Sequence, residues 1–473
     1  MKTTTAPPAA SAYVKTVDYS RREFLRVAAK LSVAGTAAPF ALNLAGIGAA
    51  AAQTATDYRA LVCVFLFGAN DHNNTVIPYD TANFNAYTTA RASISRPFAD
   101  LVPLTPTAAL TGNNAGRQFA LPKELTALKP IWDQGKLAVL ANVGPLIVPT
   151  TKIQFTNATV PLPPKLFSHN DQQSVWQSNS AEGARYGWGG RMGDLFAAQN
   201  ANAIFTCNSI TGAAVFLAGA TTVAYQLGVS GSVAIAGLSG NLYGSATAAN
   251  TLRSIITDGG SSLFSQDLAA TTTRSISADQ ILSSALASAP DYLLTPDLAN
   301  NTLAQQLRVV SRMIAARTTL GQKRQVFFVS LGGFDTHDIQ LITQPDLHTQ
   351  LGAALAYFYA NLQSLNISNN VTTFTASDFG RTLTSNGDGS DHGWGSHHFI
   401  MGGAVKGGQY YGTFPIMGYN NNDEVGSGRL LPSTSVDQYA ATLATWFGVS
   451  NTDMQLVLPN IGNFSTSNLG FLS

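Results

Sequence analysis

The sequence predicts an α/β protein with a doubly wound, mainly parallel sheet. Four continuous apolar runs have the composition of strands that are buried on both faces, and helical patterns lie between them. Strands that alternate with helices along a chain build a parallel sheet with helices on both faces. At 473 residues the chain is long enough to bury a large core, and 45% hydrophobic residues supply one.

The elements follow in order along the chain. The predicted strands are Ala60–Phe67, Leu137–Val143, Gln325–Leu331 and Val371–Ala376. Apolar residues spaced by three and four predict a helix around 303–314 and another around 347–362, on either side of the third strand. A last helix opens near Ser435 and stops at Gly448, as helices often do at glycine. Residues 201–290 are rich in Gly, Ser, Ala and Thr, and we expect a loop-rich insertion with short strands and helices there rather than a separate domain.

The first 52 residues have the pattern of a bacterial export signal. Arg21 and Arg22 follow a polar leader and precede a Gly/Ala-rich apolar stretch, Leu31–Ala52, as in signals that the twin-arginine translocation machinery binds. A membrane anchor and an amphipathic helix are the alternatives, but the stretch is only weakly hydrophobic. We therefore expect residues 1–52 to be removed after export. Residues 53–473 should then form a single periplasmic or secreted domain without a stable membrane span.

Composition excludes several partners and cofactors. With 27 Lys and Arg against 26 Asp and Glu, the chain is too balanced in charge to bind the phosphate backbone of nucleic acid. Only two cysteines are present, Cys63 and Cys207, which excludes iron–sulfur clusters and cysteine-rich zinc sites. Cys63 lies in an apolar run, which favours a buried thiol over a disulfide. Any metal must therefore be held by histidines and carboxylates.

Polar residues gather directly after the predicted strands, where open α/β sheets bind their ligands. They are Asp71 and His72 after the first strand, Asp335 and His337 after the third, Asp378 and Arg381 after the fourth, and Asp391, His392, His397 and His398 in the loop that comes next. Five of the seven histidines fall in these motifs and His169 in a separate loop motif, whereas His348 fits a surface position on a helix. A single histidine often only bonds a loop, but the cluster favours a site for zinc, magnesium, calcium or manganese.

Ser168 is a candidate nucleophile. It precedes a predicted short helix, His169–Asn179, so its hydroxyl is placed beside free backbone N–H groups. Such a position binds anions and activates a hydroxyl when a cation lies close, although plain helix capping is the alternative. The G-x-S-x-G motif of serine hydrolases is missing from the sequence. The loop Gly187–Gly193 has Met192 in place of the third glycine of a dinucleotide-binding fingerprint, which gives that reading little support.

At these motifs the chain resembles the bacterial domain-of-unknown-function family 1501. The ordered motifs are FLFGANDHNNTVIPYD, LFSHNDQQSVWQS, GWGGR, LGGFDTHD, SDFGRT, DHGWGSHHFIMGGAVKGGQYYG and VDQYAATLATWFG, between about Ala60 and Gly448. That family looks like a distant branch of the alkaline phosphatase and sulfatase superfamily. Its members bind one or two divalent metals at strand ends and attack phosphate or sulfate esters with a residue at a helix N-terminus. The resemblance thus implies an alkaline phosphatase-like fold and an exported, metal-dependent ester hydrolase.

The resemblance also implies roles for single residues. The implied metal ligands are Asp71, Asp335, His337, Asp378 and His392, with Ser168 as the nucleophile. The chain departs from the superfamily pattern because Asp335 and His337 are two residues apart instead of four, and because Phe379 stands where a histidine usually follows Asp378. One metal position is then lost or rebuilt from His397, His398 or Asp391. Arg381 either neutralises charge on the transferring group or pairs with a carboxylate.

Two other function classes stay open at this point. One is an exported, non-catalytic protein in which a degenerate metal site only stabilises the fold. The other is a protein that binds a surface polymer or carbohydrate through Trp394, Tyr410 and Tyr411, which lie near Gly-rich loops. The hydrolase reading predicts a small-molecule or polymer ester as substrate.

Overall fold

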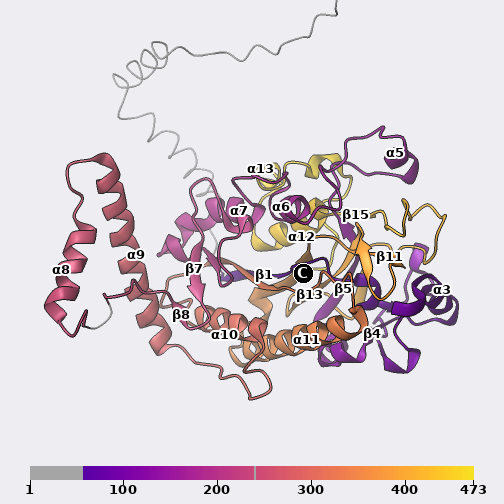
Figure 1. Ribbon diagram of the computed structural model, residues 1–473, viewed down its shortest axis with the longest axis horizontal. Coiled ribbons are helices and arrows are strands. Elements are labelled where there is room, and N and C mark those ends of the chain that lie inside the picture. The colour runs from indigo at the N-terminus through magenta and orange to yellow at the C-terminus, as the bar shows by residue number, and fades with distance from the viewer. Residues whose placement is uncertain (1–56, 239–240) are drawn as a thin grey trace, which may run out of the picture. The chain divides into compact units, whose positions relative to one another are not determined.

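A large sheet with helices on both faces organises the protein in the computed structural model, which describes residues 57–238 and 241–473 (Figure 1). The expected export signal at residues 1–52 lies outside the described residues. The described residues belong to one compact unit. Among them, each helix is too short or too polar to cross a lipid bilayer.

The central sheet has ten strands, in the order β14-β5-β13-β10-β1-β9-β6-β7-β8, with β15 paired to β5. The four predicted strands are confirmed as β1 (Arg59–Leu66), β5 (Leu137–Gly144), β9 (Arg324–Leu331) and β10 (Val371–Ser377). Strand β1 lies between β9 and β10 and is parallel to both. The carboxyl ends of these three strands therefore meet at one edge, which is where the polar motifs follow.

Strand β13 (Ser396–Gly402) corrects the expectation that His397 and His398 lie in a loop after the fourth predicted strand. It pairs antiparallel with β10 on one side and with β5 on the other, so the sheet is mainly but not wholly parallel. Successive side chains of a strand face opposite sides of the sheet. His397 accordingly contacts His72, with ring centroids 4.7 Å apart, while His398 contacts Trp176 at 4.8 Å.

Helices cover both faces of the sheet, as the doubly wound prediction requires. Alternate residues of β1 face opposite ways: Val62 and Val64 belong to one core, Cys63 and Phe65 to the other. The first core is covered by α10 (Thr302–Ala315) and α11 (Gln340–Ser364), and the second by α6 (His169–Ser178), α7 (Trp188–Phe196), α12 (Val436–Phe447) and α13 (Met454–Val457) (Figure 1). The helices predicted around 303–314, around 347–362 and from Ser435 to Gly448 are confirmed.

The segment expected to be a loop-rich insertion, residues 201–290, contains short strands and two longer helices. The strands β6 (Cys207–Ser209), β7 (Tyr225–Gly228) and β8 (Gly231–Ser232) extend the central sheet beyond β9. The helices α8 (Ala246–Thr257) and α9 (Leu263–Ser288) then project as a pair beside β8 (Figure 1).

The remaining strands and α-helices are β2 (Ile77–Pro78), α3 (Thr81–Arg91), β3 (Leu101–Pro103), β4 (Phe119–Pro122), α4 (Lys129–Asp133), α5 (Lys152–Thr156), β11 (Arg381–Ser385), β12 (Ser390–His392), β14 (Gln409–Tyr411) and β15 (Thr434–Ser435).

Two predictions about single residues have opposite outcomes. Cys63 and Cys207 are both buried and free, which confirms the preference for unpaired thiols. The surface position expected for His348 is wrong, because His348 is only 2% exposed. It lies in α11, and its Nε2 is 3.1 Å from Thr75 Oγ1. Leucine spacing predicts the helix but not which way a neighbouring polar side chain faces, and His348 is buried because Thr75 gives it a hydrogen-bond partner.

Acid should destabilise the fold through its buried histidines. Burial lowers the pKa of His348, His397 and His398 to about 3, whereas histidines in an unfolded chain titrate at about 6.5. Above about pH 6.5 these histidines are neutral in both the folded and the unfolded chain. Between about pH 6.5 and 3 only the unfolded chain takes up the protons. The free energy of unfolding should therefore fall by about 1.4 kcal/mol per pH unit for each of these histidines.

Urea unfolding at a series of pH values measures this loss. The variant His348→Gln removes one titrating side chain, so its unfolding free energy should depend less steeply on pH between about 6 and 4. A slope equal to that of the wild type would contradict the assignment of a neutral, buried His348.

Candidate metal centre

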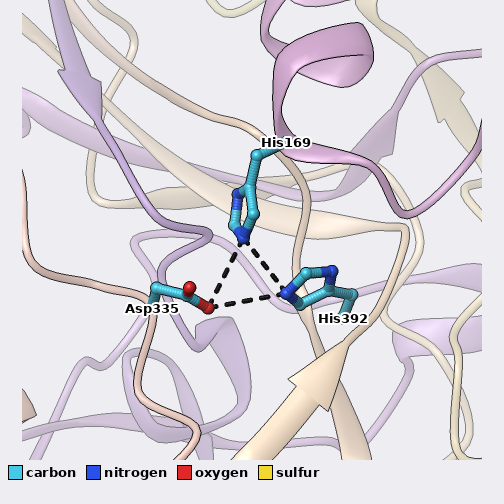
Figure 2. Close-up of side chains that lie close together, drawn as sticks. All are labelled: His169, Asp335 and His392. Carbon is cyan, nitrogen blue, oxygen red and sulfur yellow. Dashed lines mark hydrogen bonds and ion pairs between the residues drawn. The ribbon is translucent and has the colours of Figure 1, made fainter.

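Three histidines and one carboxylate converge at the carboxyl edge of the sheet, and we call them the His/Asp cluster. Its members are His169 at the start of α6, Asp335 in the loop after β9, His337 in the same loop and His392 at the end of β12. Figure 2 shows the side chains of His169, Asp335 and His392 pointing toward one another. Each of these three offers one ligand atom, and the three atoms lie within 4.8 Å of one another.

The separations within the His/Asp cluster are short and similar. Nε2 of His392 is 3.1 Å from Nε2 of His169 and 2.9 Å from Nε2 of His337. Oδ1 of Asp335 is 3.4, 3.1 and 3.5 Å from Nε2 of His169, His337 and His392, respectively. All three imidazole rings thus direct the same nitrogen toward one carboxylate oxygen.

The other ring nitrogen of each histidine meets an oxygen that only accepts hydrogen bonds. Nδ1 of His169 is 2.5 Å from Asp378 Oδ2, Nδ1 of His337 is 3.1 Å from Asp391 Oδ1, and Nδ1 of His392 is 2.7 Å from the carbonyl oxygen of Phe167. Carboxylates and carbonyls cannot donate, so Nδ1 carries the proton in each ring. Neutral rings therefore present lone pairs on Nε2 to one another, and such lone pairs repel at 2.9 to 3.1 Å unless a proton or a metal cation lies among them.

The pKa values of His169 and His392, whose Nε2 atoms face each other, shift in opposite directions. The hydrogen bond from His169 to Asp378, with the negative charge of that carboxylate, raises the pKa of His169 despite its partial burial. Burial lowers the pKa of His392, and the positive charges of its neighbours add to that effect. In the absence of a metal, a proton would therefore settle on His169 before His392.

The turn before α6 places His169 and His392 relative to each other. Lys165 and Phe167 have φ of 44° and 73°, in the left-handed region that residues with side chains rarely adopt. Backbone held in this region is found preferentially at functional sites. Here it turns the carbonyl of Phe167 toward Nδ1 of His392, directly before His169 enters the helix.

Ser168 holds the N-cap position of α6, as predicted, but its hydroxyl does not cap the helix backbone. Its Oγ donates to Oδ2 of Asp171 at 2.9 Å. Asp171 is buried and lies 3.6 Å from Nζ of Lys165. The hydroxyl is half-buried, beside His169, and rests on a carboxylate that accepts its proton in a hydrogen bond.

Arg381 fixes the position of Asp335. The guanidinium is fully buried, with Nη1 donating to Asp335 Oδ1 at 2.7 Å and Nη2 donating to the carbonyl of Ser390. Burial of Asp335 opposes ionisation, but the hydrogen bond and charge of Arg381 outweigh it and hold the pKa of Asp335 below its usual value. Of the two roles open for Arg381, the contacts favour the carboxylate partner.

Asp378 lies behind His169 rather than inside the His/Asp cluster. Its Oδ2 accepts hydrogen bonds from Nε2 of Gln173 at 2.9 Å and from the backbone of Gly68 at 3.3 Å, in addition to His169. Its Oδ1 is buried and has no hydrogen-bond partner among the described residues. Phe379 fills the place of the expected histidine, and its ring packs 4.9 Å from that of His169 and 4.8 Å from that of His392.

Two residues expected as ligands take other partners. Asp71 forms a fully buried ion pair with Arg91 from α3 and also accepts a hydrogen bond from Gln340 at 2.5 Å. Nδ1 of His397 accepts a hydrogen bond from the backbone of Asn142 at 3.0 Å, and the residue is buried. The structure therefore brings Asp335, His337 and His392 together and places Asp71 and His397 elsewhere.

His169 is the member of the His/Asp cluster that the sequence did not predict. Its sequence signal was present, because it belongs to the motif LFSHND and follows the candidate nucleophile directly. The aromatic residues considered for polymer binding also need correction. Trp394 and Tyr410 are buried, at 1% and 7% exposure, and their polar atoms donate to the carbonyls of Pro145 and Leu104. Tyr411 is half-buried.

Comparison with known proteins gives one family. The family described as "Protein of unknown function (DUF1501)" matches residues 58–456. No curated protein sequence matches the chain. The crystal structure of Ps i-CgsB in complex with k-i-k-neocarrahexaose is 8% identical with a TM-score of 0.34, and the match covers 85% of this chain and 74% of that one.

Two further solved structures match more weakly. One, titled for glycosaminoglycan metabolism by Bacteroides thetaiotaomicron, is 14% identical with a TM-score of 0.21, over 37% of this chain and 39% of that one. The other is a mutant of alkaline phosphatase PafA, 14% identical with a TM-score of 0.26, over 69% of this chain and 64% of that one. At scores this low, the likenesses carry no argument about the fold or chemistry of this chain.

Replacing Arg381 tests how the loop that carries Asp335 is held. Arg381→Met keeps the volume of the side chain but removes hydrogen bonds to Asp335 and Ser390, so the free energy of unfolding should fall by about 1–3 kcal/mol. The matched control is Arg308→Met, which removes the more exposed ion pair with Asp291 and should cost at most about 1 kcal/mol. Urea unfolding of both variants measures the difference. Equal losses of unfolding free energy would show that Arg381 holds the Asp335 loop no more firmly than an exposed ion pair holds its partner.

Proposed function

We propose that this chain, which belongs to the DUF1501 family of proteins of unknown function, holds one divalent cation in the His/Asp cluster and hydrolyses phosphate or sulfate esters. The observation that carries the proposal is the convergence of three histidine Nε2 atoms on one oxygen of Asp335. A divalent ion removes the repulsion among their lone pairs. With an ion bound, the short distances between the ring nitrogens are those between ligands of one metal.

The cluster fits zinc best among the divalent ions considered. Zinc binds histidine nitrogen at about 2.0–2.1 Å, so neighbouring ligands of a tetrahedral site are about 3.3 Å apart. The five separations within the cluster, 2.9 to 3.5 Å, bracket that value. Three nitrogen ligands disfavour magnesium and calcium, which prefer oxygen. The acceptors on Nδ1 supply the outer hydrogen bonds that zinc-binding histidines almost always make.

The residues around the cluster support ester hydrolysis. When bound, the ion would supply Lewis acidity, which polarises an ester oxygen and favours ionisation of a nearby hydroxyl. Ser168 lies at the N-terminus of α6, where free N–H groups attract an anionic ester. Asp171 already accepts the hydrogen bond of the Ser168 hydroxyl and is placed to take up its proton. Phe379 covers the rings of His169 and His392 and keeps water from that side.

One observation favours a second candidate, a non-catalytic protein stabilised by its metal. The hydroxyl of Ser168 is held by Asp171, which is itself paired with Lys165, instead of being directed at Asp335 or the histidines. A serine that stays in this position serves only to order the turn before α6. Burial of Trp394 and Tyr410 removes support for the third class, a polymer-binding protein.

Export and domain organisation belong to the same proposal. We propose that the twin-arginine machinery exports the folded protein, that residues 1–52 are then removed, and that residues 53–473 act in the periplasm or outside the cell. Folding before export suits a metal that must be loaded in the cytoplasm. The described part of the sheet, with ligands at its carboxyl edge, supports an alkaline phosphatase-like arrangement.

Metal content tests the His/Asp cluster. Wild-type protein should contain about one zinc per chain by elemental analysis, and His169→Ala should lose it because a ligand is removed. Asp391→Asn, which weakens the hydrogen bond to His337, should reduce zinc affinity by about 10–100-fold. The control is Asp338→Asn, an exposed carboxylate three residues from Asp335, which should bind zinc like the wild type. Unchanged zinc in His169→Ala would refute this ligand set.

The pH dependence of zinc binding offers a further measurement. Zinc competes with the proton on His169, whose pKa is raised by Asp378. Zinc affinity should therefore be constant above that raised pKa and fall as the pH drops through it. In Gln173→Ala, which leaves His169 and Asp378 in place, the same fall should be seen. An affinity that does not change between about pH 8 and 5 would exclude a histidine ligand.

Hydrolysis separates the enzyme from the non-catalytic candidate. The zinc-loaded protein should hydrolyse an aryl phosphate or an aryl sulfate, and Ser168→Ala should abolish turnover while keeping its zinc. The fold should survive, because the hydroxyl makes one hydrogen bond worth about 1 kcal/mol. Turnover in Ser168→Ala would assign the attack to water. Bound zinc with no turnover of either ester would favour the non-catalytic protein.

A further inference from the structure

Arg429 is a positively charged residue beside the His/Asp cluster that the proposed metal centre does not use. It closes a tight turn, in which its backbone carbonyl accepts from Val425 at 2.9 Å and its backbone N–H donates to Gly426 at 3.1 Å. Its side-chain Nε donates to the carbonyl oxygen of His392 at 3.1 Å. The ring of His392 belongs to the His/Asp cluster, so this one residue connects Arg429 to the centre.

The guanidinium of Arg429 lies over the ring of Phe167. Its central carbon is 4.4 Å from the ring centroid, a distance at which a cation is attracted to the face of an aromatic ring. The carbonyl of Phe167 is 2.7 Å from Nδ1 of His392, and Phe167 directly precedes Ser168 in the chain. Arg429 is therefore held against the turn that carries the candidate nucleophile.

The outer end of this guanidinium is free to bind a ligand. Among the described residues, only Nε of the Arg429 side chain has a hydrogen-bond partner, and no carboxylate forms an ion pair with it. The residue is half-buried, and neither Nη1 nor Nη2 is shut off from solvent. The two terminal nitrogens of an arginine lie in one plane and can donate together to two oxygens of a phosphate or sulfate group.

Arg381, the other arginine near the centre, cannot serve an anionic ligand in this way. Its guanidinium is fully buried and donates to Asp335 and to the carbonyl of Ser390. Neutralising the charge of a bound ester was one of the two roles open for Arg381, and its contacts favour the other. That role is left to a cation with open donors, and Arg429 has them.

The charges around the centre are distributed unevenly. Lys165, whose side chain is 70% exposed, lies in the same turn before α6, with Nζ 3.6 Å from Asp171. The exposed carboxylate of Asp391 instead contacts His337. Positive side chains therefore gather at the turn that Arg429 contacts, which favours an anion there.

We propose that Arg429 binds a phosphate or sulfate group of the substrate through Nη1 and Nη2, beside the ion that the His/Asp cluster would hold. The group is either the ester that is cleaved or a second anionic group of the same molecule. The role of Arg429 in hydrolysis rests on the function proposed above, whereas binding of a free oxyanion needs no turnover. Arg429 is thus a specificity residue, which selects anionic over neutral esters.

Calorimetry with inorganic phosphate and inorganic sulfate tests this site on the full, metal-loaded protein. The wild type should bind at least one of the two anions. Arg429→Met removes both donors and should weaken that binding by about tenfold or more. Arg429→Lys keeps the charge but loses the planar pair of donors, so its affinity should be intermediate. The matched control is Arg274→Met, which removes an exposed arginine of α9 and should bind like the wild type.

Steady-state kinetics distinguish the two sources of the anionic group. Phenyl phosphate carries one phosphate, and 1,4-phenylene bisphosphate carries a second one away from the ester that is cleaved. If Arg429 binds the cleaved ester, Arg429→Met should lower kcat/KM about tenfold for both substrates. If it binds a second group, the loss should be confined to the bisphosphate. An unchanged kcat/KM for both substrates would count against the proposal.

Equal anion binding by the wild type and Arg429→Met, or no binding of either anion by the wild type, would overturn the proposal. Melting temperature and zinc content are measured for every variant, so that loss of the fold or of the metal is recognised. If Arg429→Met does not fold, Arg429→Lys must still bind the anion more weakly than the wild type. Anion binding that depends on Arg429 without any hydrolysis would support this site and would contradict only the proposed hydrolysis.

Discussion

The buried guanidinium of Arg381 is the constraint on which the candidate metal centre depends. Its backbone pairs with His392 across the β11–β12 ladder, and its side chain reaches Asp335 in the loop after β9. One residue thereby sets the distance between a carboxylate and a histidine from segments 57 residues apart in sequence. A charge without solvent needs a partner of opposite sign, so this arrangement is costly to break. Asp335 nevertheless keeps nearly half of its side-chain surface exposed.

Helix α6 connects the centre to the rest of the fold. At its first residue, His169 reaches both Asp378, at the end of β10, and His392. Gln173, one turn later, donates a hydrogen bond to the same carboxylate. At the last turn of α6, Arg191 donates to the carbonyl of Ser178. Both ends of the helix are therefore held by charged groups, which explains how a helix of ten residues keeps His169 in position.

Much of the fold could be predicted because apolar periodicity reports burial directly. The strands β1, β9 and β10 and the helices α10, α11 and α12 follow from it. Strand β13 could not be predicted, since its sequence SHHFIMG begins with polar residues that are typical of a loop. Its histidines are buried by neighbours from β5, α6 and α12 that lie far away in sequence.

The candidate metal centre was also predictable in part, from the direction of its strands. The strand-end rule identified Asp335, His337 and His392, because it depends on the direction of parallel strands. It failed for Asp71, whose charge is taken by Arg91 from α3, a partner that no local pattern indicates. It also missed His169, because the direction in which the first residue of a helix points depends on the strained turn at Lys165 and Phe167.

X-ray absorption at the zinc edge tests the central claim most directly. The protein should be folded in the cytoplasm and purified without chelators, so that the metal it acquires is retained. The account predicts one zinc per chain with a first shell of three nitrogen atoms and one oxygen at about 2.0 Å, together with the outer scattering of imidazole rings. A protein free of metal, or a metal surrounded by oxygen alone, would contradict it.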